Sequence, residues 1–317
     1  MIGPDLKFMS LDKLRESFGE ELKEGVSLAR YSAARLGGPA DALLEASSVN
    51  ELVRVVSTCW QNELPFVLLG GGSNVLISDR GVRGLVVINR ARKSHFNERT
   101  SPPTVWAESG ANFGVVARQA AQRGLAGLEW AAGIPGTVGG AVVGNAGAHG
   151  GDMAGSLILA EILHCTRADL VGEPVREEWP VEQLEFTYRS SLLKRQPGQA
   201  VVLAARIRLE HSTSPTVQAR IDEFVAYRRK TQPPGASMGS MFKNPPGDYA
   251  GRLIEAVGLK GARIGDAEIS PLHANFFINR GRANAEDVLG LIMLTRQKVF
   301  EQFGVELELE IELLGEW

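Results

Sequence analysis

Two glycine-rich stretches of the chain are suited to holding a ligand directly against the backbone. Residues 133–151, GIPGTVGGAVVGNAGAHGG, contain eight glycines in nineteen positions. Each glycine weakens a strand or helix by roughly 0.5–1 kcal/mol, so this density indicates backbone that lies against another group. Residues 70–74, GGGSN, separate the short runs 64–69 and 75–79. A strand, a glycine turn and an extended segment present successive amide N–H groups to an anion, which predicts a bound pyrophosphate.

The same stretches carry a resemblance to a known enzyme family. Residues 69–79, LGGGSNVLISD, and 133–140, GIPGTVGG, are similar to flavin-binding signatures of the UDP-N-acetylenolpyruvoylglucosamine reductases, the MurB family. Further phrases in the same order, such as 238–245, MGSMFKNP, extend the resemblance over nearly the whole chain. Only 50 residues lie between Arg189 and Ser240, and this spacing resembles the shorter subtype, which lacks a tyrosine loop over the substrate.

The resemblance implies a flavin oxidoreductase of peptidoglycan precursor synthesis, on which cell shape and cell division depend. FAD would be bound non-covalently, NADPH would be the co-substrate, and UDP-N-acetylglucosamine enolpyruvate would be reduced to UDP-N-acetylmuramate. No group of residues has the spacing of metal ligands. The implied FAD contacts follow from the matched phrases and are Gly70, Gly71, Gly72, Ser73, Asn74, Gly133, Ile134, Pro135, Gly136, Gly140, Asn145 and Gly147.

A bound FAD would accept and donate hydride, which leaves the protein to supply one proton and to stabilise one anion. The resemblance assigns the proton to Ser240, whose hydroxyl is a poor acid and can serve only a strongly basic carbanion. It assigns the developing enolate or carboxylate to Arg189, because a guanidinium offers paired donors and stays charged. Structural alternatives stay open for both residues, namely a turn serine bonded to backbone and a solvated arginine at a strand end.

The third catalytic residue that the resemblance implies is Glu310, within the C-terminal run ELELEIEL at 306–313. Residues two apart on a strand lie about 6.6 Å apart on one face, so Glu308 and Glu312 should raise the pKa of a buried Glu310. A carboxyl kept protonated in this way can donate a hydrogen bond to the enolate. Solvated glutamates on an edge strand are the alternative.

Polar and basic residues of the C-terminal third are candidates for binding the UDP part of the substrate. Each of the cations could instead be a solvated surface charge, and a lone histidine such as His273 is often structural. His149 stands where many relatives have tyrosine, so we assign it no role. The candidates are Asn244, which matches a family asparagine near the diphosphate, Lys243, Arg228, Arg229, Lys230 and His273.

Length, charge and cysteine content indicate an ordinary globular protein. With 317 residues the chain is longer than most single cores, which predicts two or three domains. A net charge of −3 offers no general attraction for nucleic acid or an anionic membrane. Cys59 and Cys165 indicate free thiols in a reducing compartment. Because no signal peptide or long apolar run is present, we expect a cytoplasmic protein, and we expect a monomer.

Hydrophobic periodicity predicts the elements that position these residues. Helices are predicted over 10–24, 50–60, 112–124, 214–230, 249–257 and 284–299, with caps at Ser48 or Asn50, Asn112, Ser214 and Asn284. Strands are predicted over 64–69, 85–89, 156–166 and 200–209. The strict alternation of 306–313 predicts a last strand with Leu307, Leu309, Ile311 and Leu313 on one side. Residues 235–240 are typical of a glycine-serine loop.

Together the elements predict an α+β fold. The resemblance implies an FAD-binding domain of the PCMH/VAO type at residues 1–212, with two lobes at about 25–80 and 81–212. A smaller α+β substrate-binding domain is predicted at 213–303, after a shift in composition at 210–215. Residues 304–317 are predicted to return to the active site as a strand.

Two other functions are compatible with the glycine-rich stretches. One is an FAD-dependent oxidase of the wider superfamily with a different substrate, although such an enzyme has no need of the phrase GSMFKNP. The other is a non-catalytic nucleotide-binding protein, which would not bind FAD.

Overall fold

The computed structural model describes residues 4–165 and 173–317, and these fall into two compact units. The first unit comprises residues 1–23, 42–71 and 84–226, and the second comprises 24–41, 72–83 and 227–317. Neither unit is a single stretch of sequence, because short segments around residues 24–41 and 72–83 belong with the C-terminal third. The boundaries predicted at 212 and 303 divide the chain according to the ligand that each part binds. The compact units do not test such boundaries, which therefore stay predictions.

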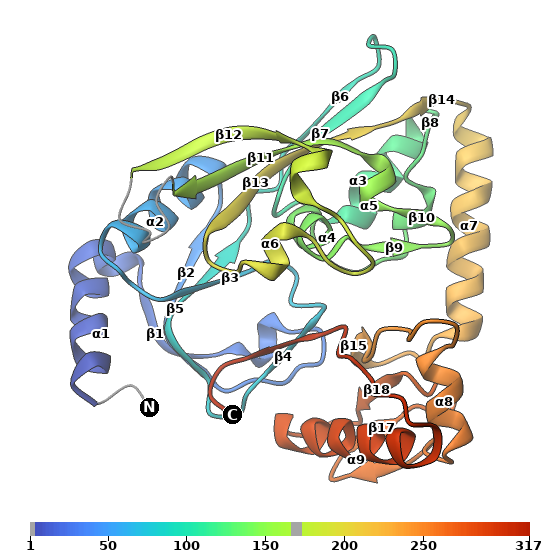
Figure 1. Cartoon of the computed structure of the whole chain (residues 1–317). Helices are drawn as coiled ribbons and strands as arrows, with labels where there is room; N and C mark the ends of the chain where they lie inside the picture. Colours follow the sequence, from blue (N-terminus) through green and yellow to red (C-terminus); the bar gives the residue numbers. More distant parts are fainter. Residues whose placement is uncertain (1–3, 166–172) are drawn as a thin grey trace. The chain divides into compact units, whose positions relative to one another are not determined.

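The first unit is built around an antiparallel five-stranded sheet (Figure 1). Helix α3 (Phe113–Gln122) and helix α4 (Val138–Gly144) contribute to the core on one face, together with Ala160 and Val202 of the sheet. Helix α2 (Val49–Gln61) shares a second core with Leu203. The strand order is β12 (Pro174–Pro180), β11 (Leu157–Cys165), β13 (Ala200–Arg208), β7 (Thr104–Glu108) and β6 (Ser94–Asn97).

A four-stranded sheet has the order β1 (Lys23–Ser27), β2 (Pro39–Ala46), β5 (Val82–Asn89) and β3 (Phe66–Leu69). Strand β3 pairs in parallel with β5, from Phe66 opposite Leu85 to Leu69 opposite Ile88. The predicted strand at 64–69 is therefore confirmed. It ends at Leu69, so the GGGSN phrase follows directly after the strand.

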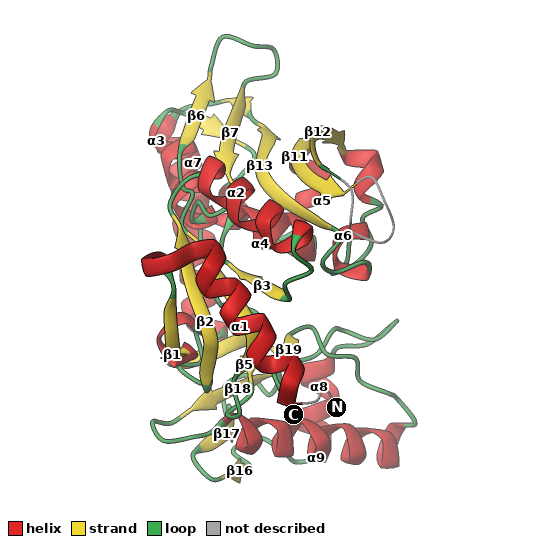
Figure 2. Cartoon of the chain, turned by 90° about the vertical axis from the view of Figure 1, so that its left-hand side faces the viewer, coloured by secondary structure: helices red, strands yellow, loops and turns green. Residues whose placement is uncertain are grey.

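The second unit packs two helices against an antiparallel sheet. The sheet order is β15 (Ala236–Ser240), β18 (Phe276–Asn279), β17 (Ala267–Ile269) and β16 (Arg263–Ile264). Helix α9 (Ala285–Phe303) lies along β16 and β17, and helix α8 (Ala250–Ala256) packs on α9 (Figure 2). Strand β4 (Val75–Ile77) pairs in parallel with β19 (Glu312–Leu314), so the chain end joins the segment that follows GGGSN.

The remaining elements are short or peripheral. Helix α7 (Ser214–Thr231) is long but buries only Val217 and Ile221. The other elements are α1 (Pro4–Phe18), α5 (Met153–Ser156), α6 (Leu192–Arg195), β8 (Leu125–Ala126), β9 (Gly147–Ala148), β10 (Gly151–Asp152) and β14 (Glu210–His211). Four short 3₁₀ segments lie at Gly19–Glu21, Leu28–Tyr31, Glu129–Ala131 and Val181–Leu184.

Three predicted helix caps are confirmed. Ser48, Asn112 and Asn284 each accept a hydrogen bond from the backbone N–H three residues on, at the starts of α2, α3 and α9. The cap predicted at Ser214 is wrong, because α7 begins at Ser214 itself and Thr213 Oγ1 accepts the N–H of Thr216 at 3.4 Å. Local sequence thus located these helix starts to within one residue.

Two predictions for the C-terminal third, one of a loop and one of a strand, are wrong. Residues 236–240 form strand β15 rather than a loop, because pairing with β18 supplies hydrogen bonds that outweigh the low strand propensity of the sequence ASMGS. Residues 306–313 do not form one strand: Leu309 bridges Phe242, whereas the ladder with β4 begins at Glu312. This change of partner breaks the alternation, so Leu307 and Ile311 are buried and Leu313 is exposed.

The described residues include no helix that is both long and apolar enough to cross a membrane. With antiparallel sheets and helices mixed along the chain, the predicted α+β class is confirmed. Both cysteines are free thiols. Cys59 is fully buried in α2, and burial raises the pKa of its thiol to about 12.

We expect Cys165 to react with a thiol reagent such as DTNB at pH 8 far faster than Cys59. The reason is that the buried Cys59 is protonated at this pH, whereas Cys165 is only half-buried. Native protein should release about one equivalent of the chromophore, and protein in guanidinium chloride should release two. Cys165→Ser should abolish the native reaction; a fast native reaction in that variant would contradict the burial of Cys59.

Candidate active site

The first two glycines of the GGGSN phrase lie against residues 136 and 137 of the second glycine-rich stretch, within the first unit. A Cβ atom on Gly70 would lie 2.5 Å from Thr137 Oγ1, and one on Gly71 would lie 3.1 Å from the Cα of Gly136. Real Cβ atoms essentially never come within 3.0 Å of another heavy atom, so Gly70 has no room for a side chain. The two stretches, predicted separately as ligand-binding, are thereby brought together by the fold.

The chemistry of this junction fits a flavin dinucleotide. Thr137 caps α4 by accepting the N–H of Gly140 at 3.3 Å, and Gly140 itself is exposed, with no other heavy atom within 4 Å of its missing Cβ. Residues 70–78 and 133–151 contain no carboxylate that would repel a diphosphate. Bare backbone with amide donors and no anion is what a pyrophosphate requires. Residues Gly133, Ile134 and Pro135 form the loop before Gly136.

Asn145 ends helix α4 and connects it to the turn that carries Arg189. Its backbone is left-handed, with φ of 43°, and its side chain is almost fully buried. The side-chain amide accepts the N–H of Ala154 at 3.0 Å and donates to the carbonyl of Thr187 at 2.9 Å. Gly147 lies in β9 opposite Asp152, whose Cβ would be 2.8 Å from a Cβ on the glycine. These two predicted FAD residues are therefore tightly packed within the protein.

Arg189 lies in a tight turn of the first unit. Thr187 and Ser190 exchange backbone hydrogen bonds of 3.0 and 3.1 Å across this turn, and Arg189 has φ of 56°. A left-handed backbone is uncommon for a residue other than glycine, and such strain tends to occur at functional sites. The guanidinium lies 5.5 Å from the ring of the exposed Tyr188. Nothing in the local sequence signalled this backbone conformation.

Ser240 and Glu310 belong to the second unit, where their segments run side by side. Ser240 is the last residue of β15, opposite Phe276 of β18, and its side chain is half-buried. The next residue, Met241, accepts the backbone N–H of Glu310 at 2.9 Å. The carbonyl of Glu308 accepts the N–H of Lys243 at 2.9 Å. Two candidate catalytic residues far apart in sequence are thus brought to neighbouring backbone positions.

Burial separates Glu310 from the other glutamates of the C-terminal run. Glu310 is half-buried, whereas Glu306, Glu308 and Glu312 are exposed. Glu308 forms an ion pair of 3.0 Å with Lys243, one of the substrate-binding candidates. The sequence pattern treated all four carboxylates alike, and only the change of backbone partner near residue 310 distinguishes them.

Asn275, to which sequence reasoning assigned no role, holds the segment after Ser240. Its side-chain amide accepts the N–H of Phe242 at 3.0 Å and donates to the carbonyl of the same residue at 2.8 Å. Its backbone carbonyl accepts the N–H of Met241 at 2.8 Å. A fully buried asparagine that bonds both the N–H and the carbonyl of one residue fixes the backbone of that residue in place. No local signal in the sequence could have identified this partner.

His273, two residues earlier, has a structural environment. Its Nδ1 accepts the N–H of Asn275 at 3.3 Å, and its ring packs against Gly251 of α8 and lies 4.9 Å from the ring of Phe276. Burial is the main cause that lowers the pKa of this imidazole. At neutral pH His273 is therefore a neutral ring, which disfavours a direct ionic role toward phosphate.

The basic residues at the end of α7 differ in their surroundings. Arg229 and Lys230 are exposed, whereas Arg228 is half-buried and burial lowers the pKa of its guanidinium. A cation that loses hydration in this way gains most from a bound anion. Asn244 is exposed, and its Oδ1 accepts the N–H of Ala250 at the start of α8 at 3.1 Å.

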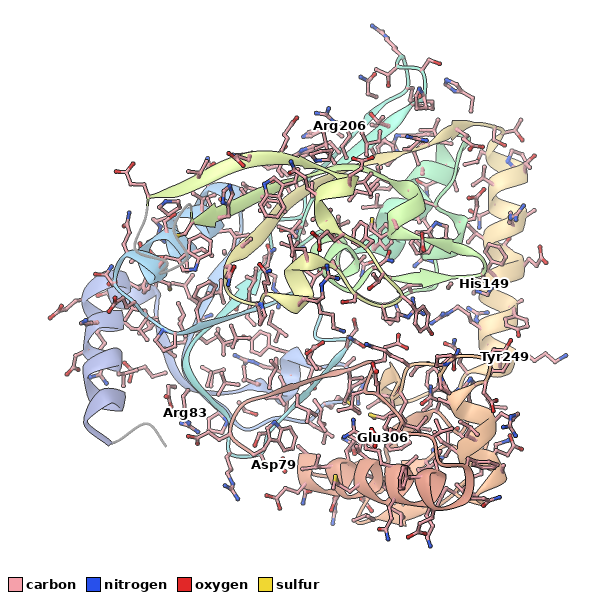
Figure 3. All side chains as sticks on the ribbon, viewed as in Figure 1. Asp79, Arg83, His149, Arg206, Tyr249 and Glu306 are labelled. Carbon is pink, nitrogen blue, oxygen red and sulfur yellow. The ribbon has the colours of Figure 1, made fainter. Side chains whose placement is uncertain are left out.

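His149 stacks on α7 within the first unit (Figure 3). It lies between β9 and β10 with φ of 52°, and its ring is 4.2 Å from that of Phe224 with an angle of 6° between the planes. An aromatic ring of any kind could make this contact, which accounts for a histidine at a position where tyrosine was expected.

Two family models match the chain. Residues 231–314 match the C-terminal domain of UDP-N-acetylenolpyruvoylglucosamine reductase, and residues 40–166 match an FAD binding domain. The first match contains Ser240 and Glu310, and the second contains both glycine-rich stretches.

Full-length relatives agree with these matches. A UDP-N-acetylenolpyruvoylglucosamine reductase of Rubrobacter xylanophilus is 47% identical over 289 residues, covering 91% of this chain and 94% of that protein. One of Chloroflexus aggregans is 43% identical over 304 residues, covering 95% and 100%. The crystal structure of the Thermus caldophilus enzyme matches with a TM-score of 0.75 at 36% identity, covering 91% of this chain and 97% of that one.

We expect Gly70→Ala to weaken both the fold and FAD binding. The added methyl group would displace the Thr137 side chain, and losing a helix cap costs about 1 kcal/mol. Chemical denaturation should show this loss, and the affinity for FAD, measured by flavin fluorescence, should fall about tenfold or more.

Gly144→Ala, in the helix α4 that Thr137 caps, is the matched control, because no heavy atom lies within 4 Å of the missing Cβ of Gly144. Alanine there should stabilise the helix by roughly 0.5–1 kcal/mol and leave the affinity for FAD unchanged. Equal effects of the two substitutions would rule out a special role for the Gly70–Thr137 contact.

Proposed function

Since this chain belongs to the UDP-N-acetylenolpyruvoylglucosamine reductase family, we propose that it reduces UDP-N-acetylglucosamine enolpyruvate to UDP-N-acetylmuramate with NADPH. Family membership rests on relatives that are 47% and 43% identical over more than nine tenths of the chain. The reaction belongs to peptidoglycan precursor synthesis. When bound, FAD accepts hydride from NADPH and later supplies it to the enolpyruvyl group. The match at residues 231–314 sets aside the oxidase alternative, since it extends beyond the flavin-binding region.

The pairing of residues 241–243 with 308–310 is the observation that carries the catalytic assignment. Hydride addition to the terminal carbon of the enolpyruvyl group leaves a carbanion beside the carboxylate. The hydroxyl of Ser240 donates a proton to that carbon, which is basic enough to accept one from an alcohol. The carboxyl of Glu310 donates a hydrogen bond to the enolate oxygen, and the guanidinium of Arg189 binds the substrate carboxylate.

Substrate phosphates need a local cation, and Arg228 is the best placed by its burial. Its pKa is lowered because water is partly excluded from the guanidinium, and a bound diphosphate would offset that loss of hydration. Asn244 supports the same role, because its Oδ1 is engaged by the Ala250 N–H and its NH₂ group is left to donate to an oxygen of the UDP. Lys243, Arg229, Lys230 and His273 stay candidates for weaker contacts.

These assignments give each part of the chain a separate role. Residues 1–212 bind FAD, residues 213–303 bind the UDP-sugar, and residues 304–317 carry Glu310 to the reacting carbon. The predicted substrate contacts outside Arg189 all lie in the second unit. We place the enzyme in the cytoplasm, where NADPH and UDP-sugars occur, and propose that it is a monomer.

Ser240→Ala should separate the two halves of the reaction. We expect purified protein to be yellow, and its flavin to be bleached by anaerobic NADPH at the same rate in wild type and variant. Re-oxidation by the enolpyruvyl substrate should slow by several orders of magnitude in the variant, since only this half needs the proton. Ser237→Ala, in the same strand, should leave both halves within about twofold. Equal slowing of both halves by Ser240→Ala would remove its role as acid.

Arg228→Met should raise the KM for the UDP-sugar about tenfold or more with little change in kcat, because a charge-assisted hydrogen bond contributes about 1.5–3 kcal/mol. Arg229→Met should change KM by less than about twofold, since an exposed cation contributes little. Steady-state kinetics at fixed NADPH would test both variants. The reverse order of effects would transfer the phosphate contact to Arg229.

A further inference from the structure

Glu310 is held by backbone hydrogen bonds from two sides, and one of the two partners is Asn74. The N–H of Glu310 donates to the carbonyl of Met241 at 2.9 Å. Its carbonyl accepts the side-chain Nδ2 of Asn74 at 3.0 Å. Two residues on, the N–H of Glu312 donates to the backbone carbonyl of Asn74 at 2.9 Å. All four residues belong to the second unit.

The side chain of Asn74 extends a strand ladder past its end. The parallel pairing of β4 with β19 begins with Val75 opposite Glu312. Before β19, the nearest paired residue of the chain is Leu309, which forms an isolated bridge with Phe242. Glu310 lies between these two pairings, where the chain changes partner, and Asn74 bonds its peptide at that point. The orientation of the Glu310 carboxyl therefore depends on a peptide that one side-chain amide helps to fix.

We propose that Asn74 is a positioning residue for Glu310. Asn74 closes the GGGSN phrase, so the segment that ends the flavin-binding turn also sets the position of the carboxyl that acts on substrate. This inference deepens the proposed function and rests on the role that it gives to Glu310. An amide is needed because a carbonyl oxygen accepts only from a donor, and a carboxylate at position 74 would repel it.

Asn74→Leu tests the proposal, because leucine has a similar size, lacks the donor and adds no carboxylate to the phosphate-binding turn. Since the resemblance also assigns Asn74 to the FAD site, both half-reactions are measured on protein saturated with FAD, where we expect bleaching by NADPH to slow far less than re-oxidation. Re-oxidation by the enolpyruvyl substrate should slow about tenfold or more, as for a lost buried hydrogen bond that leaves its acceptor unpaired. In a Glu310→Gln background the same change should slow this step by less than about threefold, because residues that act as a unit are not additive.

Asn279→Leu is the control. The Nδ2 of Asn279 donates to the carbonyl of Ala34 at 3.0 Å in the same unit, and its Oδ1 accepts the N–H groups of Gly281 and Ala283, so this variant loses at least as many side-chain hydrogen bonds. It should leave re-oxidation within about twofold. If Asn74→Leu protein does not fold, Asn74→Ser, which keeps a neutral donor of shorter reach, carries the same expectations for bleaching and for non-additivity.

Three outcomes would overturn the proposal. One is equal slowing by the Asn74 change in the wild-type and Glu310→Gln backgrounds. Another is equal slowing of bleaching and of re-oxidation in FAD-saturated protein, which would make Asn74 a residue of the cofactor site alone. The third is a full re-oxidation rate for Glu310→Gln itself, and this result would reject the role of Glu310 in the proposed function as well.

Discussion

Hydrogen bonds between residues 241–243 and 308–310 are the interaction on which the chemistry of the second unit depends. They bring together the segment after Ser240 and the segment that carries Glu310. Phe242 anchors the pairing because its ring is fully buried and Asn275 bonds both its backbone N–H and its carbonyl. A loss of this anchoring would move the proposed acid and the carboxyl together, since neither segment belongs to a long, regular strand at this point.

The first unit meets a different requirement, which is close approach of backbone to backbone. At Gly70 and Gly71 the chain passes so near Thr137 and Gly136 that a methyl group would clash at Gly70 and would fit only tightly at Gly71. Glycines here are therefore explained by the protein itself as well as by FAD, whose diphosphate needs amide donors without carboxylates nearby. Asn145 then links this region to the turn of Arg189, so residues proposed for the cofactor and for the substrate are packed together.

The proposed site depends on which charged groups are buried more than on how many charged groups the chain has. The chain has a net charge of −3, and most of its ion pairs are exposed, where they add little to stability. Arg228 differs because burial lowers the pKa of its guanidinium. His273 is neutral for the same physical reason, and its ring packs against α8. Loss of hydration thus favours an anion beside the Arg228 guanidinium, and it keeps the His273 imidazole uncharged.

The sequence by itself determined the features that depend on neighbours in the chain. Helix starts at Ser48, Asn112 and Asn284 are correct because a cap bonds an amide three residues away. The glycine-rich phrases also carried the resemblance to flavin enzymes. Tertiary structure alone decided that residues 236–240 are a strand and that the alternation of 306–313 breaks. It also decided that Glu310 is half-buried while the other glutamates of this run are exposed. In each case the deciding hydrogen bonds come from residues distant in sequence, namely β18, β4 and Asn74, whose bonds outweigh the local pattern.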